Sequence, residues 1–172
     1  MRSKLLILGL LAASVLPCAA FAGDSGSDKK KSDDFNCTIT ADKDDKVAQH
    51  KDLVIHPGEK VKDAVVLHGN VTLKKGAVVE KVVAINGNVI LEAGSKVKDD
   101  VVALAGSVFV HEDVEIGGDL TALSGTLNVD AKATVKGDRM SLGKVEINGT
   151  DYARKMIHEA IANERHCKVE KK

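Results

Sequence analysis

Short apolar runs recur at a fixed spacing along most of this 172-residue chain. Four ten-residue segments nearly copy one another: AVVLHGNVTL at 64–73, VVAINGNVIL at 82–91, VVALAGSVFV at 101–110 and LTALSGTLNV at 120–129. Each copy holds a marker glycine, and successive markers are 18, 19 and 19 residues apart: Gly69, Gly87, Gly106 and Gly125. A repeat of this period, with its aliphatic positions in register, predicts stacked copies of one small unit.

Three apolar runs separated by turns make up one copy. In the copy at 82–100 they are 82–85, 89–91 and about 96–98, with turns at Asn86-Gly87-Asn88 and Ala93-Gly94 and a third break at Lys98-Asp99-Asp100. Three short strands and three bends predict one triangular rung, and neighbouring rungs then pair as parallel strands about 4.8 Å apart. A six-residue register, typical of the left-handed form, is missing. The sequence therefore predicts an all-β fold, a single-stranded right-handed parallel β-helix of about five 18–19-residue rungs over 52–149.

Stacking turns each repeat position into a column of similar side chains. We expect three inward columns: Leu67, Ile85, Leu104, Leu123 and Leu142; Val71, Val89, Val108, Leu127 and Val145; and Leu73, Leu91, Val110, Val129 and Ile147. The first run is apolar on both sides, which for a parallel strand indicates cover on both faces. We therefore expect an apolar outer face that consists of Ala64, Val66, Val82, Ala84, Val101, Ala103, Leu120 and Ala122.

The segments that flank the repeats have their own patterns. Residues 35–51 predict an N-terminal strand and loop, and 150–172 predict a C-terminal helix and tail. Thr150 or Asp151 can cap the start of the helix. Its apolar stripe consists of Tyr152, Met156, Ile157, Ala160 and Ile161. The stripe is long enough to cover the outer face, but the helix can equally fold over the last rung. In that case the outer face is free for another copy or a partner.

The first 22 residues have the pattern of a secretory signal peptide. Arg2 and Lys4 precede the apolar run LLILGLLAASVL, and Ala20-Phe21-Ala22 is a cleavage pattern, so we expect cleavage after Ala22 and a periplasmic or secreted protein. The run is too short to cross a bilayer. A lipid-anchored form would need cleavage immediately before Cys18, but Pro17 occupies the preceding position, where a small residue is expected. Residues 23–34 are polar and charged, which predicts a disordered leader.

Charge and composition exclude some partners. Without Arg2 and Lys4 the chain has 23 basic and 25 acidic residues, a net charge of −2. A balanced charge and very few aromatic residues argue against nucleic acid. Cys37 and Cys167 remain after cleavage and lie just outside the two ends of the repeat region. In an oxidising compartment they are a candidate disulfide; the alternative is two unpaired thiols.

No motif of a catalytic site is present, and we expect neither enzyme activity nor a cofactor. The histidines are scattered, so we expect no metal centre. One weak metal candidate is a column of carboxylates at a rung corner, Asp100, Asp119 and Asp138, with Asp63 and Lys81 below it. Such a column can bind calcium, or each Asp can bond its own backbone at a bend. A second column predicts a hydrogen-bonded turn ladder: Asn70, Asn88, Ser107 and Thr126.

With GNV-type turns inside an aliphatic 17-to-19-residue period, residues 52–149 resemble the bactofilins, which are polymer-forming bacterial cytoskeletal proteins. The resemblance implies a nucleotide-free scaffold that assembles end to end through its hydrophobic core rungs. The sequence thus favours an exported, non-enzymatic structural or interaction protein of the bacterial cell envelope, which self-associates through the solenoid ends or the apolar face. The alternative is a β-helix that binds or modifies cell-wall or capsular polysaccharide. A third class, acyltransferase coils, would need the missing hexads.

Overall fold

The computed structural model describes residues 38–144, 146–147, 149–161 and 168–171. All of them belong to one compact unit, Asp34–Lys172. The predicted signal peptide (1–22), the leader (23–34), Cys37 and Cys167 lie outside the described residues.

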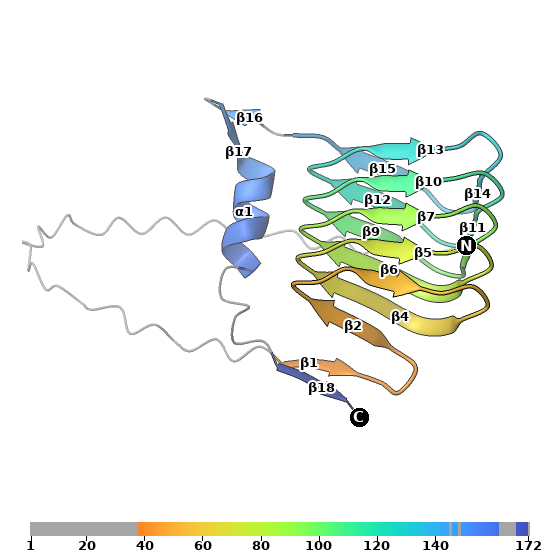
Figure 1. Cartoon of the computed structure of the whole chain (residues 1–172). Coiled ribbons are helices and arrows are strands. Elements are labelled where there is room, and N and C mark those ends of the chain that lie inside the picture. Colours follow the sequence, from red (N-terminus) through yellow and green to blue (C-terminus); the bar gives the residue numbers. More distant parts are fainter. Residues whose placement is uncertain (1–37, 145, 148, 162–167, 172) are drawn as a thin grey trace, which may run out of the picture. The chain divides into compact units, whose positions relative to one another are not determined.

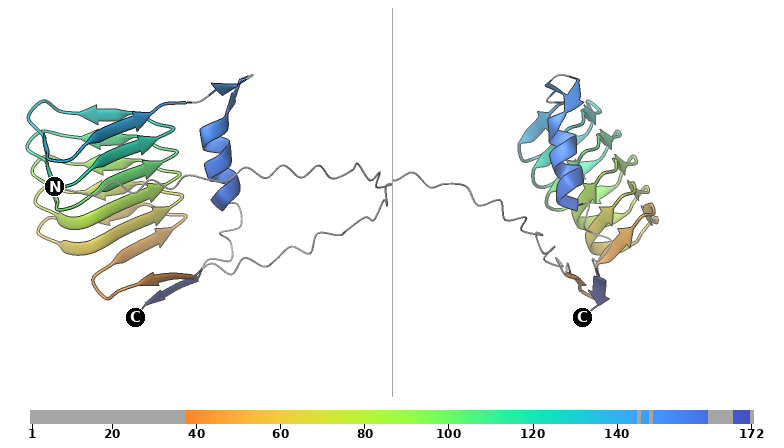
Figure 2. Two further views of the ribbon diagram at one scale, coloured as in Figure 1. Left: turned by 180° about the vertical axis from the view of Figure 1, so that it is seen from behind. Right: turned by 90° about the vertical axis from the view of Figure 1, so that its left-hand side faces the viewer.

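The repeats form a parallel β-solenoid of about five turns, which winds as a right-handed coil (Figure 1). The second runs make a five-stranded parallel sheet, and Figure 1 shows it at the front: β3 (Leu53–Ile55), β5 (Val71–Leu73), β7 (Val89–Leu91), β10 (Val108–Val110) and β13 (Leu127–Val129). The first and third runs share a nine-stranded sheet on the other side of the solenoid, and the left view of Figure 2 shows it toward the viewer. Its strands are β2 (Lys46–Gln49), β4 (Lys60–Leu67), β6 (Val78–Ile85), β8 (Lys96–Val97), β9 (Val101–Leu104), β11 (Glu115–Ile116), β12 (Leu120–Leu123), β14 (Thr134–Val135) and β15 (Arg139–Leu142). The predicted fold class is confirmed.

Rung length determines whether the third corner is bent. In β6, Val79 and Val82 are three residues apart, but their partners Val97 and Val101 in the next rung are four apart. The nineteenth residue of the longer rungs therefore lies between β8 and β9 and separates them. In the shorter rungs β4 and β6 run through this corner as single eight-residue strands. The break predicted at Lys98-Asp99-Asp100 exists there, but the earlier copies lack it.

The marker glycines are required because the rungs stack closely at the first corner. A Cβ on Gly87 would lie 1.7 Å from the carbonyl oxygen of Gly69, and a Cβ on Gly106 would lie 1.8 Å from that of Gly87. The residue before the glycine takes the left-handed conformation, as in Asn86 (φ 55°) and Ala105 (φ 55°). Non-glycine residues adopt this conformation rarely, and the repeat places one at the same corner of successive rungs.

The core corrects the predicted direction of the first run. The eight residues expected on an apolar outer face are fully buried, at 0% exposure, and form the interior: Ala64, Val66, Val82, Ala84, Val101, Ala103, Leu120 and Ala122. The column expected to be inward lies on the opposite, outward side of the same strands, and its exposure rises to 51% at Leu142. Both sides are apolar, so alternation alone could not tell them apart. The alanines show the reason at the ends of these strands, where the narrow interior takes Ala84 rather than Ile85 and Ala103 rather than Leu104.

The other two inward columns are confirmed where the structure describes them. Val71, Val89 and Val108 are fully buried, as are Leu73 and Leu91. Leu127 and Val129, in the last of these rungs, are half-buried. Val145 and the side chain of Ile147 lie outside the described residues. The interior is thus a dry stack of aliphatic side chains that ends in a less covered rung.

The flanking segments include a strand pair that the sequence did not predict. At the N-terminal side of the solenoid β1 (Thr38–Ala41) pairs in parallel with β18 (Lys168–Lys171), so the first and last described strands meet. The N-terminal strand predicted within 35–51 is thus present as β1, from Thr38 onward. After the last rung, β16 (Glu146–Ile147) pairs antiparallel with β17 (Thr150–Asp151).

The C-terminal helix is present as α1 (Tyr152–Ile161). Asp151 caps it, because its Oδ1 accepts a hydrogen bond from the Arg154 amide at 3.0 Å. Two residues of its apolar stripe are exposed, Tyr152 at 41% and Met156 at 69%. Within the described residues, no helix has the length and hydropathy needed to cross a bilayer.

Candidate functional site

The polar column at the first corner is a ladder of hydrogen bonds between rungs. The Asn88 amide donates to Asn70 Oδ1 at 3.0 Å, and the Ser107 amide donates to Asn88 Oδ1 at 2.9 Å. The Thr126 amide continues the pattern to Ser107 Oγ at 3.1 Å. Each side chain thus satisfies the backbone of the next rung. The predicted turn ladder is confirmed.

The carboxylate column at the third corner works in the same way. The Asp119 amide donates to Asp100 Oδ1 at 3.0 Å, and the Asp138 amide donates to Asp119 Oδ1 at 2.9 Å. The expectation that each Asp bonds its own backbone is therefore wrong for Asp100 and Asp119, which bond the rung above. The residue before Asp119 is a glycine for a related reason, since a Cβ on Gly118 would lie 2.4 Å from Asp100 Oδ1.

Lysine supplies positive charge to this column. Lys81 Nζ lies 3.2 Å from Asp100 Oδ2 and 3.4 Å from Asp99 Oδ2. The Asp119 amide, and then Lys81, hold the pKa of Asp100 below its usual value. The same carboxylates raise the pKa of Lys81. No group of three or more potential metal ligands occurs among the residues that the structure describes.

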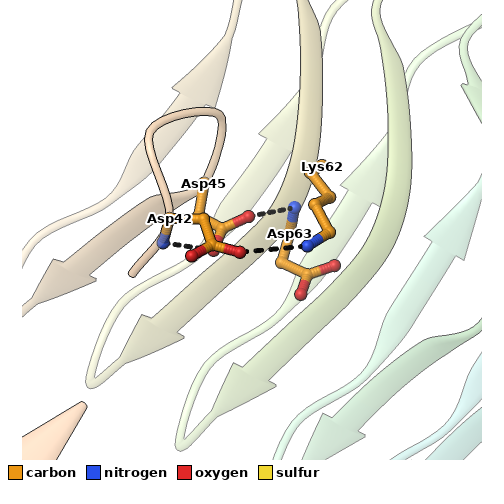
Figure 3. A network of polar contacts seen from close by, with 4 residues as sticks. All are labelled: Asp42, Asp45, Lys62 and Asp63. Atoms are coloured by element: carbon orange, nitrogen blue, oxygen red, sulfur yellow. Dashed lines mark hydrogen bonds and ion pairs between the residues drawn. The ribbon is translucent and has the colours of Figure 1, made fainter. Parts of the chain in front are cut away.

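The column starts at a turn beneath the first full rung (Figure 3). The Asp63 amide donates to Asp45 Oδ1 at 3.2 Å, while Asp45 Oδ2 accepts from the Asp42 amide at 2.7 Å. Lys62 Nζ reaches Asp42 Oδ2 at 3.1 Å. Burial, and then the charge of Asp45, raise the pKa of Asp63. These contacts fasten the turn to the stack, which is a structural role.

Two histidines that sequence analysis treated as scattered lie together. The rings of His50 and His68 stack with their centroids 5.0 Å apart, and His68 Nδ1 lies 2.7 Å from Asn86 Nδ2. The sequence feature that predicts this contact is their spacing of 18 residues, which gives them the same position in successive rungs. His56, His111 and His158 are exposed. His166 lies outside the described residues.

Two rungs above Asn86, at the same corner, a hydroxyl connects the solenoid to the C-terminal segment. Ser124 is 2% exposed, and its Oγ donates a hydrogen bond to Asp151 Oδ2 at 2.8 Å. The Arg154 amide, and then this bond from Ser124, lower the pKa of Asp151. Asp151 therefore joins the start of α1 to the corner of a rung.

The last rung leaves the hydrophobic interior partly open. Its strands are β13, β14 and β15, and no described strand pairs with their outer edges. Leu127, Val129 and Val135 are half-buried here, whereas Val108, one rung earlier, is fully buried. All four residues of β15 are exposed. Met140 is 53% and Leu142 51% exposed. Met140 and Leu142 lie on the outward side of β15, so we define the open end as the inward residues Leu127, Val129 and Val135.

An open hollow of about 480 Å³ adjoins the open end. It is lined by Phe109, Val110, His111, Leu127, Asn128, Val129 and Asp130. Phe109 points away from the interior and is 38% exposed. An aromatic ring thus lies beside an imidazole, an amide and a carboxylate.

Comparisons with models of protein families, with curated proteins and with solved structures return no match for this chain. What is established is therefore the architecture, a parallel β-solenoid of about five turns. No relative supplies a function, so a function can be inferred only from the surfaces of the solenoid.

Proposed function

We propose that this chain is an exported, non-enzymatic structural or interaction protein of the bacterial cell envelope, and that it associates with itself through the open end of its solenoid. The observation that carries this proposal is the incomplete burial of the inward residues Leu127, Val129 and Val135 beside the unpaired edges of β13 and β15. Unpaired parallel edges over a hydrophobic interior are templates for another chain. The signal-peptide pattern at 1–22 supports export.

A second copy of the chain is the partner that fits the open end best. The end presents two strand edges separated by the width of one rung, with aliphatic side chains between them. Only a rung of the same cross-section can extend both sheets together and cover that interior. The resemblance of the repeats to bactofilins supports the sharper form of the proposal, a scaffold that assembles end to end.

Sedimentation of the full chain over a wide range of concentration and salt tests the association. We expect species larger than a monomer for the wild type, and a monomer for Leu127→Lys/Val129→Lys, because burying unpaired lysines in the contact is costly. Met156→Lys, which adds a lysine at an exposed position on α1 away from the open end, is the control and should behave as the wild type. A wild type that stays monomeric throughout would overturn the proposal, as would a control that dissociates equally.

A substitution at the other edge of the same sheet identifies the surface that meets the open end. Leu53→Lys changes β3, the outermost strand at the N-terminal side of the five-stranded sheet. If copies meet head to tail, this variant is also monomeric. If two open ends meet, Leu53→Lys leaves the association intact.

The hollow beside Phe109 favours the alternative, binding of cell-wall or capsular polysaccharide. An exposed ring offers an apolar platform, and His111, Asn128 and Asp130 offer hydrogen-bonding groups around it. Co-sedimentation with purified peptidoglycan tests this function. Retention that Phe109→Ala abolishes would favour it over self-association, whereas equal retention of both proteins, or none, would exclude this hollow as a glycan site.

A further inference from the structure

The chain leaves the stack at the corner that follows β15. In each described rung below it, three residues connect the first run to the second run. β15 still continues the stack, with Leu142 opposite Leu123. The same three-residue corner would therefore be 143–145, and the second run of a further rung would begin at Glu146. Instead, β16 turns away and pairs antiparallel with β17.

A lysine occupies the position where this further corner would need a marker glycine. The next marker after Gly125 would be position 144, which is Lys144. At Gly125 itself a Cβ would lie 1.8 Å from the Gly106 carbonyl oxygen. If the corner stacked, the Cβ of Lys144 would meet the Gly125 carbonyl oxygen in the same way, far inside van der Waals distance. The corner has left the stack, since Gly143 is exposed, whereas Ser124, one rung below it, is buried.

The other end of the marker column shows when a lysine is tolerated. Lys51 occupies the marker position 18 residues before Gly69. It belongs to the corner before β3, and β3 is the first strand of its sheet among the described residues. Lysine thus occurs at a marker position where no described corner lies beneath it.

Glu146 is a second residue that does not fit a further rung. Position 146 would lie above Leu127, the inward residue that begins β13. A carboxylate over the hydrophobic interior is costly without a partner. Outside the stack Glu146 is exposed, and its Oε1 lies 3.7 Å from Lys144 Nζ. The two residues that do not fit the stack therefore pair with each other beside it.

The segment that leaves the stack is fastened at its side. In the hairpin of β16 and β17, Asp151 lies opposite Glu146. Asp151 Oδ2 accepts the hydrogen bond from the buried Ser124 Oγ at 2.8 Å. The hairpin is therefore held at the corner before β13, and the outer edge of β13 has no described partner.

We propose that Lys144 and Glu146 are a stop, which ends the solenoid and keeps Leu127 and Val129 uncovered for a second copy of the chain. Without the stop, the chain's own residues 146–148 would pair with β13 as a further strand and cover them. The purpose of the stop rests on the proposed self-association. Its existence depends only on the corner and is tested separately.

The amide of Leu127 reports whether a further rung has formed. One rung below, the Val108 amide donates to the carbonyl oxygen of Thr126, at the corner above it, at 2.9 Å. A further rung would give the Leu127 amide the carbonyl oxygen of position 145 in the same way. Hydrogen exchange of this amide, followed by NMR, therefore measures the addition of the strand.

Two variants that differ by a single Cβ test the stop. Lys144→Gly/Glu146→Thr removes the obstacle at the corner and places a strand-forming residue above Leu127. Lys144→Ala/Glu146→Thr removes the same charges but keeps the Cβ. We expect the Leu127 amide to exchange roughly tenfold more slowly in the glycine variant than in the alanine variant, at every protein concentration. The amides of β7 should stay protected in both variants, which shows that the solenoid is intact.

Equal exchange at Leu127 in the two variants would overturn the proposal, because a Cβ at position 144 would then not end the stack. If either double variant does not fold, the single variants Lys144→Gly and Lys144→Ala repeat the comparison, and equal exchange there has the same meaning.

Sedimentation connects the stop to self-association. We expect the glycine double variant to be monomeric at concentrations at which the wild type and the alanine double variant associate. The added strand would cover Leu127 and Val129 and present threonine and Asn148 at the new end, which favour contact with water. Association of the glycine variant in spite of slow exchange at Leu127 would overturn the purpose of the stop. A monomeric wild type would overturn the proposed function together with that purpose, whereas the exchange comparison would still decide whether the stop exists.

Discussion

Single atoms decide how closely two rungs can stack. The hydrogen on Gly106 Cα occupies a place where a Cβ would lie 1.8 Å from the Gly87 carbonyl oxygen. That oxygen belongs to backbone and cannot move aside without moving its rung. We expect Gly106→Ala to lower the free energy of unfolding by about 3 kcal/mol or more, measured by urea denaturation.

Gly143 provides the matched control for this substitution. A Cβ there would have no heavy atom within 4 Å. Gly143→Ala should therefore change the unfolding free energy by less than about 0.5 kcal/mol. Equal effects of the two substitutions would show that the close approach at the marker glycines does not exist.

Asp100 shows how a polar corner residue connects rungs. Its Oδ1 accepts the Asp119 amide, and Oδ2 lies near Lys81 Nζ. Asp100→Asn keeps an oxygen for the amide, whereas Asp100→Ala removes it. We expect the alanine variant to be less stable than the asparagine variant by about 1 kcal/mol at neutral pH, measured by urea denaturation. Equal stabilities would show that the amide needs no partner there.

The same carboxylate predicts a pH dependence with a definite sign. Its pKa is lowered in the fold from 3.8, so its contribution is complete above 3.8 and is lost as the pH falls through the lowered value. The stability advantage of the wild type over Asp100→Asn should therefore shrink on acidification below 3.8. An advantage that grows in acid would contradict the assignment.

On the scale of one strand, β6 offers a test of which side is the interior. Val82 is fully buried, while its neighbour Val83 is half-buried on the other side. The exchange of valine for threonine preserves shape but adds a hydroxyl. We expect Val82→Thr to cost about 1–3 kcal/mol of unfolding free energy because the hydroxyl is buried without a partner. Val83→Thr should cost much less. The reverse order would restore the direction first predicted for this run.

The sequence predicted the elements well where one physical constraint acted alone. The glycine period predicted the rungs, and the Asn–Ser–Thr column predicted a ladder, because stacking repeats the same requirement in each rung. The prediction of which side of the first run faces the interior was wrong, because both sides are apolar. The small alanines on one side indicate the side that a narrow interior accepts. The pairing of β1 with β18 could not be predicted, since it joins two short segments that lie far apart in the sequence and share no repeat.

For the whole molecule, stability is distributed along one axis. Each rung contacts mainly the rungs next to it, so a folded solenoid depends on the sum of similar interfaces. The two ends differ in what covers them. At the N-terminal side the chain continues into β1, which pairs with β18, whereas the C-terminal side ends in the exposed strand β15. This difference favours the C-terminal side as the surface of the proposed self-association.

The central claim is that residues one repeat apart in sequence lie one rung apart in space. Spin labels on outward positions of one column measure this directly, in a chain whose own cysteines are replaced by serine. Val47 is the fixed label, and Val102, Thr121 and Met140 lie three, four and five rungs above it in the paired register. We predict backbone separations of roughly 14, 19 and 24 Å, a constant step of about 4.8 Å per rung. Distances by electron double resonance that do not rise by equal steps from one position to the next would contradict the stacked solenoid.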